Sequence, residues 1–289
     1  MWFWYGVLSG LFSALSVILN KKALGNVSAA LVSWTLFVLP LPFLFVMVLR
    51  EGIPSFNVMF FVGAVGSSVV YAVSKTISLQ SIKNNLLSKL FPLSSFGTFF
   101  TYILGLLFLG EKITMLPLIG LIFIIIGAYL LNADRAKEHF LMPLKLLFTH
   151  KESFIFIIAM IGNSVAGIFD KVGVINTVPR SSTFVLFVED IVLAILLTVY
   201  LLKNDHGWLN DFKKHFWVLA IGSFIYTLLA LFFLMGIVTG AVVLVGGIKK
   251  LEILFVLILS YLFFHDKPLK YVWLGSIIML AGVLLIKIG

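Results

Sequence analysis

Six ionisable side chains lie inside long apolar stretches of the sequence and are the first candidates for chemistry: Lys75, Glu189, Asp190, Lys249, Lys250 and Glu252. A charged group at the centre of a bilayer costs roughly 2.5–3.5 kcal/mol, whereas a leucine or phenylalanine there contributes only about 0.3–0.6 kcal/mol of stabilisation. Such residues usually face the interior of a helix bundle, pair with one another, and mark a site or a pathway.

The three positive and three negative groups permit complete pairing. Lys249 and Glu252, three positions apart, share a helix face and are expected to be neighbours, whereas Lys250 points elsewhere. Glu189 or Asp190 is the expected partner of Lys250. One interpretation is that the lysines attract an anionic group while Glu252 or Glu189 carries a coupling proton. The alternative is that these charges are structural ion pairs that fasten the two predicted helices together.

Tyrosines and further lysines extend the candidate set. Tyr71 and Tyr226 offer hydroxyls to a cavity, although aromatic side chains in a bundle more often pack. Lys171 is a candidate for the same anionic group; alternatively Lys21 and Lys171 cap helix C-termini, where a cation meets the negative end of the dipole. Lys75, late in its apolar stretch, is expected to extend to the membrane interface.

The sequence lacks the patterns of metal, thiol and nucleotide chemistry. Its five histidines fall in loops or at predicted helix ends without metal-ligand spacing, and it has no cysteine. No phosphate-binding loop follows a strand. A membrane-embedded enzyme would need a positioned acid–base or metal cluster at the interface, and these residues form none. We therefore expect no metal, no cofactor and no enzymatic activity.

Composition identifies the environment of these residues. Of 289 residues, 61% are hydrophobic and 11% charged, and the mean hydropathy is +1.15. Ordinary soluble domains are roughly 45–50% apolar and about 25% charged. The chain is therefore predicted to be an all-α integral membrane protein with the lipid bilayer as a partner. In such a protein a net charge of +9 does not indicate nucleic-acid binding, so we expect no nucleic-acid partner.

Ten stretches are long and apolar enough to cross a bilayer, which takes about 20 residues per helix. They are residues 2–19, 29–49, 58–80, 86–109, 114–132, 153–170, 182–202, 216–238, 241–263 and 271–287. The longest polar break, residues 133–152, is predicted to link two five-helix units, residues 1–132 and 153–289.

The two units repeat each other. Glu111-Lys112 recurs as Asp266-Lys267 at an offset of 155, and Asn20-Lys21 recurs as Asp170-Lys171 at an offset of 150. The offset of 155 also aligns other pairs: Gly120 with Gly275, Gly127 with Gly282, and Tyr71 with Tyr226. Because five is an odd number, the second copy enters the membrane from the opposite side. Inverted repeats of this kind imply alternating access around a central site.

These duplicated pairs carry a family resemblance, together with Leu90-Phe91-Pro92 in the fourth stretch, Leu109-Gly110-Glu111-Lys112 after it, and Gly120 and Gly127 in the fifth. In order and spacing they resemble the drug/metabolite transporter superfamily, in its ten-helix EamA-like branch. The resemblance covers nearly the whole chain. It implies a secondary transporter, in a family whose substrates are very diverse.

Broken helices at corresponding positions indicate where such a transporter binds its substrate. Pro92 interrupts the fourth stretch, and the offset of 155 superposes it on Gly247 in the ninth. Starting two positions after Gly247 the sequence reads Lys249-Lys250-Leu251-Glu252, whereas starting two positions after Pro92 it reads Ser94-Ser95-Phe96-Gly97. The charge is therefore concentrated in the second unit.

A second resemblance supports the lysines. The sugar-phosphate branch of the superfamily has a lysine closing helix 6 and an adjacent basic pair in helix 9, and there they contact phosphate. Lys171 and the pair Lys249-Lys250 stand at those places. The pair is Lys-Arg in that branch, and lysine lacks the bidentate fork of arginine. Glu252 nearby also disfavours a doubly charged anion.

We therefore predict a secondary active transporter that moves a small polar or charged metabolite by alternating access, coupled to protons or to exchange. The alternatives are an organic-phosphate/phosphate antiporter and, from another class, a membrane-embedded enzyme acting on lipid-linked groups. The expected location is the plasma membrane, with several crossings. The sequence leaves open whether the protein is a monomer or a homodimer.

Overall fold

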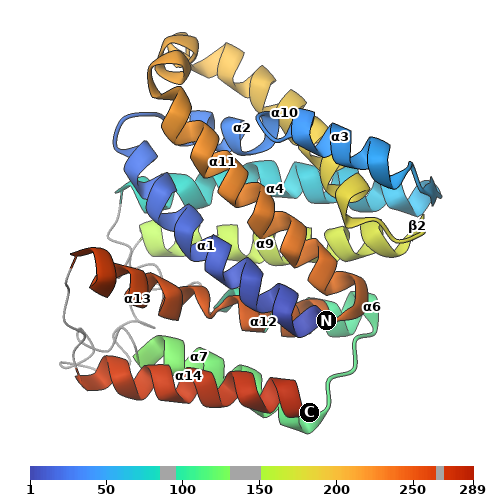
Figure 1. The fold of residues 1–289 in the computed structure, drawn as a ribbon, viewed down its shortest axis with the longest axis vertical. Helices are drawn as coiled ribbons and strands as arrows, with labels where there is room; N and C mark the ends of the chain where they lie inside the picture. Colours follow the sequence, from blue (N-terminus) through green and yellow to red (C-terminus); the bar gives the residue numbers. More distant parts are fainter. Residues whose placement is uncertain (85–95, 131–150, 265–269) are drawn as a thin grey trace.

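The computed structural model describes residues 1–84, 96–130, 151–264 and 270–289. In these ranges every regular element is a helix except one antiparallel pair of two-residue strands, β1 (Ser55–Phe56) and β2 (Thr177–Val178) (Figure 1). The all-α prediction is confirmed for the described residues. The motif Leu90-Phe91-Pro92, the pair Asp266-Lys267 and nearly all of the predicted linker 133–152 lie outside them.

The helices follow the order of the predicted spans. They are α1 (Trp2–Leu24), α2 (Ala29–Val38), α3 (Leu41–Glu51), α4 (Val58–Asn84), α6 (Phe96–Leu109), α7 (Met115–Leu130), α9 (Lys151–Ile175), α10 (Ser182–Asn204), α11 (Trp208–Thr239), α12 (Val242–Lys249), α13 (Glu252–Phe264) and α14 (Lys270–Ile288). Within the described ranges, six spans are long and apolar enough to cross a membrane, with α2 and α3 counted together. The full number of ten crossings stays a prediction.

Local chemistry sets several helix boundaries. The Ser28 hydroxyl accepts a hydrogen bond from the Leu31 amide at the start of α2, and the Ser181 hydroxyl accepts one from the Phe184 amide at the start of α10. Each serine thereby satisfies a donor that has no partner in the first helical turn. Pro40, which has no amide hydrogen, separates α2 from α3.

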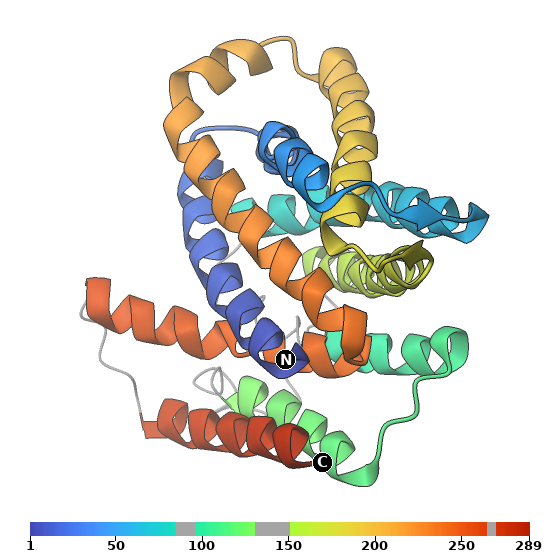
Figure 2. The same ribbon diagram turned by 45° about the vertical axis from the view of Figure 1, so that its right-hand side comes forward.

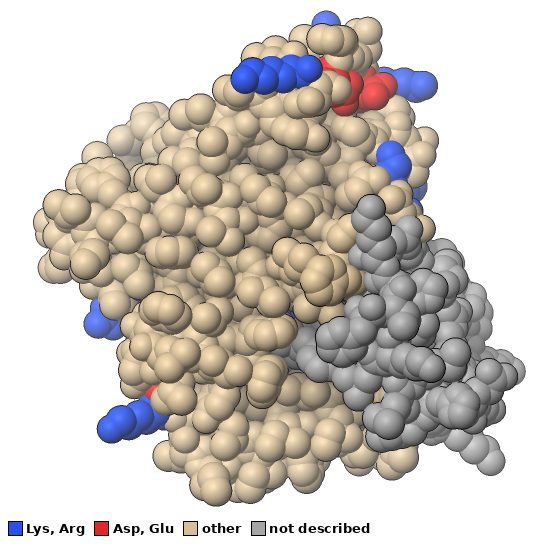
Figure 3. All heavy atoms as spheres, turned by 180° about the vertical axis from the view of Figure 1, so that it is seen from behind, with Lys and Arg blue, Asp and Glu red and all other residues tan. Residues whose placement is uncertain are grey.

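The outer surface is apolar over a wide area. Large hydrophobic side chains such as Val58, Val73 and Leu107 are 78%, 61% and 69% exposed. On the face shown in Figure 3, lysine and arginine side chains lie toward the edges and leave a broad uncharged area between them. An apolar surface of this extent is suited to lipid rather than water.

The closest helix pairs follow the repeat: replacing each helix of a pair by its counterpart in the other half gives a pair that is also observed. The closest pairings are α1 with α11, α4 with α9, and α7 with α14. Counted as spans, the first joins span 1 to span 8 and the second joins span 3 to span 6, so each is the image of the other. The third joins spans 5 and 10 and is its own image; Figures 1 and 2 both show these helices side by side.

Glycines allow the close approach of α7 and α14. A Cβ at Gly120 would lie 2.5 Å from the carbonyl oxygen of Gly282, and a Cβ at Gly127 would lie 2.6 Å from that of Gly275. Each contact is the image of the other under the repeat, because Gly120 corresponds to Gly275 and Gly127 to Gly282. The repeat glycines are therefore explained by helix packing.

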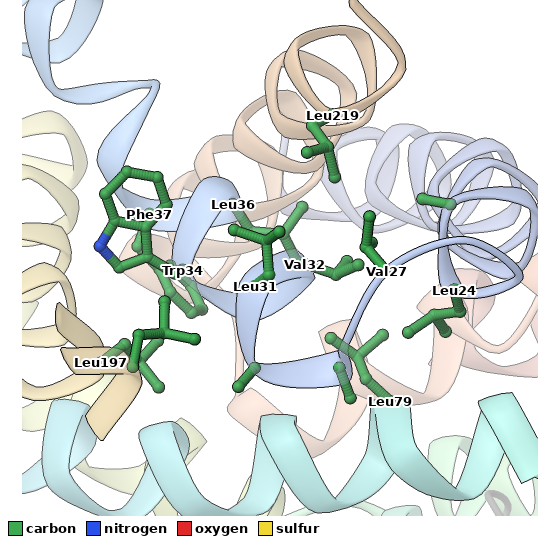
Figure 4. Packing of buried hydrophobic residues seen from close by; sticks show 14 of the residues in the cluster. Leu24, Val27, Leu31, Val32, Trp34, Leu36, Phe37, Leu79, Leu197 and Leu219 are labelled. Atoms are coloured by element: carbon green, nitrogen blue, oxygen red, sulfur yellow. The ribbon is translucent and has the colours of Figure 1, made fainter. Parts of the chain in front are cut away.

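A large apolar cluster packs α2 against its neighbours. Trp34 contacts Trp208 edge-on, with ring centroids 4.9 Å apart, and its indole nitrogen donates to the Thr198 hydroxyl at 2.7 Å. Figure 4 shows part of the cluster, including Leu24, Leu31, Leu36, Leu79, Leu197 and Leu219 from five different helices. This cluster supports one end of the polar centre described below.

The structure corrects the position of one helix break. The sequence predicted an interruption at Gly247, but α12 continues to Lys249, and Lys250 and Leu251 form the turn before α13. Gly247 has a packing role, since a Cβ there would lie 2.4 Å from Leu121 Cδ2 on α7. The break therefore falls within the charged segment itself.

Candidate functional site

Two equivalent tyrosines meet at the centre of the molecule. The hydroxyl oxygens of Tyr71 on α4 and Tyr226 on α11 are 2.6 Å apart. Residues related by a two-fold repeat touch each other only close to the axis of that repeat. Phe37 on α2 packs edge-on against both tyrosine rings, with centroids 6.0 and 5.7 Å away. This hydrogen bond therefore marks the junction of the two halves.

Backbone contacts around the tyrosines obey the same repeat. Ser223 donates to the Thr35 carbonyl at 2.8 Å, and Ser68 donates to the Glu189 carbonyl at 3.2 Å. The two serines are 155 positions apart and their acceptors are 154 apart, so one bond is the image of the other. The framework of the site is thus nearly symmetric.

A cavity of about 230 Å³ lies on one side of the tyrosines, between α4, α6, α9, α11 and α12; we call it the lysine cavity. Its charged lining residues are Lys75, Lys249, Lys250 and Glu252. The Lys75 ammonium lies 4.4 Å from the ring centre of Tyr226 and 5.9 Å from that of Tyr71. The expectation that Lys75 extends to the interface is wrong, because this cation–π contact holds it inside.

The ion pairing differs from the predicted pattern. The Lys250 ammonium lies 3.8 Å from the Glu252 carboxylate, which also accepts a hydrogen bond from Ser13. Lys249 instead lies 5.3 Å from the ring centre of Phe233. The predicted neighbours Lys249 and Glu252 would share a face only on an unbroken helix, and the turn between them removes that relation.

A second cavity, of about 150 Å³, lies between α4, α9, α10, α11 and α12; we call it the carboxylate cavity. Its charged lining residues are Asp170, Glu189, Asp190 and Lys249. It shares Tyr71, Asn163, Phe233 and Lys249 with the lysine cavity. The two spaces therefore adjoin, and Lys249 lies between them. The predicted pairing of Lys250 with Glu189 or Asp190 does not occur, since Lys250 is paired with Glu252.

Several polar atoms of the carboxylate cavity have no hydrogen-bond partner. Glu189 is 5% exposed and Asp190 is 2% exposed, and one carboxyl oxygen of each is buried without a partner. The same is true of the Asn163 side-chain oxygen. Buried polar atoms are usually satisfied, so these atoms are available to a ligand or an ion.

Lys171 lies away from both cavities. Its ammonium donates to the carbonyls of Ile237 and Gly240 at the C-terminal end of α11. Lys21 makes the equivalent bond to the carbonyl of Ile82 in α4, 155 positions before Ile237. Both lysines therefore act as caps where a helix leaves carbonyls unpaired.

Glu111 caps the N-terminal end of α12. Both of its carboxylate oxygens accept from the Val242 amide, at 2.9 and 3.1 Å, at the start of α12. Burial raises the pKa of the Glu111 carboxyl, although hydrogen bonds from the Val242 and Val243 amides and the charge of Lys171 oppose that shift. Glu111 therefore helps to fix the connection between α11 and α12.

The described residues contain no group of three or more histidine or acidic side chains placed to hold a metal ion. Sequence reasoning missed Asp170, because it ended the sixth span at that residue, whereas α9 continues to Ile175. The aligned pairs Asn20-Lys21 and Asp170-Lys171 were the available signal, since both belong to helices that pack against the opposite half.

The fold and its buried polar centre define a multi-pass α-helical membrane protein. A family model of the EamA-like transporter family matches residues 1–133 and 150–288. The chain belongs to this family, and it is a membrane transporter by that membership. A solved crystal structure is similar over 98% of this chain and 96% of its own, with a TM-score of 0.70 and 12% identity, and supports the fold alone. No curated protein sequence matches.

Proposed function

We propose that the protein is a secondary active transporter that moves a small polar or charged metabolite by alternating access. The observation that supports this is a pair of adjoining, charge-lined cavities at the junction of two repeats. Inverted-repeat transporters bind substrate at this interface and alternate by moving one repeat against the other. Lys75 and Lys249 have no carboxylate within 4 Å among the described residues, so they are the favoured contacts for an anionic group.

The organic-phosphate alternative is less well supported. It relies on Lys171, Lys249 and Lys250, yet Lys171 caps a helix and Lys250 is paired with Glu252. Only Lys249 is left to contribute an uncompensated charge. A membrane-embedded enzyme is also not favoured, since the described part of the chain holds no group of three or more histidine or acidic side chains placed to bind a metal ion.

The first experiment measures the thermal stability of detergent-purified protein against sugar phosphates, amino acids, nucleosides and organic cations. A ligand at a hundred times its Kd adds about 2.7 kcal/mol to native-state stability. We expect one chemical class to stabilise the protein, and Lys249→Met to abolish its effect while Lys171→Met retains it. Saturable counterflow of the same compound in proteoliposomes tests transport. Flux that never saturates would indicate a channel and contradict the proposal.

A further inference from the structure

The carboxylate cavity brings acidic side chains from two helices together. Asp170 on α9 and Glu189 on α10 both line this cavity, close enough for their charges to act on each other, and Ser67 on α4 donates to Asp170. Two carboxylates in one buried, apolar-walled space repel each other, which favours a proton on one of them. Their proximity therefore favours one bound proton on the pair.

The charges that line the two cavities also indicate one bound proton. The side chains that line them include four carboxyls, Asp170, Glu189, Asp190 and Glu252, and three lysines, Lys75, Lys249 and Lys250. A net charge buried inside an apolar bundle is costly. One proton on the four carboxyls makes the lining neutral. The pair Lys250–Glu252 is already balanced, so the proton belongs in the carboxylate cavity.

Unpaired acceptors show that this cavity is not a closed structural network. The free oxygens of Glu189 and Asp190 are buried and lack partners, and both residues line the cavity. The other titratable groups facing the pair are Tyr71 on α4, Tyr226 on α11 and Lys249 on α12. A purely structural carboxyl cluster would be expected to satisfy these oxygens.

The first half provides an internal comparison. Asn20 stands at the position equivalent to Asp170, and Gly222, whose added Cβ would lie 3.7 Å from the Asn20 side-chain oxygen, stands at the position equivalent to Ser67. Thr35 corresponds to Glu189. The same helix packing is thus achieved in the other half with neutral side chains. The acidic pair is therefore not needed for the fold.

We infer that Asp170 and Glu189 share one exchangeable proton and form the proton-coupling site of the transporter. In the protonated state one carboxyl donates its O–H to the other carboxylate. When the proton leaves to water, both groups are ionised and their repulsion favours a cationic group, either Lys249 or a positive group of the substrate. The coupling part of this inference rests on the proposed function, whereas the bound proton does not.

Infrared spectroscopy of the purified full-length protein tests the bound proton directly, through the C=O stretch of a protonated carboxyl. We expect this band in the wild-type protein at neutral pH and its loss in both Asp170→Asn and Glu189→Gln. Asp170→Asn copies the residue that the first half carries, so it should fold. Glu51→Gln is the matched control, because Glu51 lies at the end of α3 and bonds to Thr183, away from this cavity. Absence of the band in the wild type, or its persistence in both variants, would overturn the inference.

Proteoliposomes with an imposed pH gradient test the coupling. For a compound found to undergo counterflow, we expect proton-driven accumulation by the wild type and at least a tenfold lower ratio of accumulation to counterflow in Asp170→Asn. An unchanged ratio, or accumulation driven by sodium instead, would refute coupling at this pair while leaving the transporter proposal intact. If the wild type showed no counterflow, the proposed function would fail, and the infrared result would still decide whether the proton is bound.

Discussion

The two halves of the molecule make the same contacts at their helix ends but place different residues at the centre. Lys21 and Lys171 donate to the equivalent carbonyls of Ile82 and Ile237. These paired contacts use only backbone acceptors and one long cation. Because both halves keep them, they belong to the helix framework that the two repeats share.

The central positions diverge in charge. Asn20 in the first half is replaced by Asp170 in the second, and Thr35 is replaced by Glu189. Conversely, the charged Lys75 of the first half corresponds to the neutral Ala230 of the second half. Residues that differ while the surrounding helices keep the same packing are best explained by function. The comparison therefore separates structural symmetry from a functional asymmetry that the following substitutions test.

The largest effect is expected at the ion pair that only the second half carries. Lys250→Met leaves the Glu252 carboxylate buried without its cation, and breaking one partner of a buried pair costs about 3 kcal/mol or more. We expect a marked fall in the thermal stability of the purified protein. The double variant Lys250→Met/Glu252→Gln should recover most of it, because a neutral replacement of a buried pair is often tolerated.

Transport by the same double variant separates pairing from binding. A stable double variant without counterflow would mean that Lys250 or Glu252 contacts the substrate. Full counterflow would restrict both residues to a structural role. Equal stability of the wild type and Lys250→Met would contradict the importance of the pair.

The second largest effect is expected when a residue of the first half is replaced by its counterpart from the second half. Asn20→Asp places a carboxyl at a 5% exposed position opposite Gly222, which offers no hydroxyl in place of that of Ser67. A buried polar group left without a partner costs about 1–3 kcal/mol, and more when it is charged. We expect Asn20→Asp to destabilise the protein and the reverse change Asp170→Asn to be mild. Adding Gly222→Ser to Asn20→Asp should recover part of the loss, and equal effects in both directions would refute the asymmetry.

A smaller effect is expected at the symmetric interface of α7 and α14. Gly127→Ala brings a Cβ within 2.4 Å of Met279 Cγ and 2.6 Å of the Gly275 carbonyl oxygen, and overpacking costs typically about 1–3 kcal/mol. Gly246→Ala is the control, because among the described residues no atom beyond its own chain neighbours and helix backbone lies within 4 Å of its added Cβ. We expect a lower melting temperature for the first variant and no loss for the second. Two equal melting temperatures would show that this interface adapts.

The sequence carried much of this arrangement. Apolar stretches of membrane-crossing length and the duplicated pairs predicted the order of the helices, and the predicted site residues Tyr71, Lys249 and Glu189 line the central cavities. Hydrophobicity and repetition are properties of the amino-acid sequence itself, so they can be read without coordinates. The duplicated pairs also predicted membership of the EamA-like transporter family, and the family model confirms it.

What the sequence could not provide is the detail that depends on a helix end. The position of the break after Lys249 decides which lysine pairs with Glu252, and helical spacing assumes that no break exists. The continuation of α9 beyond Asp170 decides whether that carboxyl is inside the bundle. Lys75 points inward because it contacts two tyrosines from different halves, and the repeat offset that aligns these tyrosines does not show that they touch.

The smallest effect is expected at the caps, where the two halves should respond alike. A cation at a helix C-terminus contributes about 0.3–1 kcal/mol, and up to about 2 kcal/mol where it is partly buried. Lys21→Met and Lys171→Met each remove such a cation from the carbonyls of Ile82 and Ile237, so their melting temperatures should fall by similar amounts. Ligand-induced stabilisation should survive in both variants, because neither lysine lines the lysine cavity or the carboxylate cavity. Loss of that stabilisation in Lys171→Met alone would make Lys171 a substrate contact and give the two halves different functions at their helix ends as well.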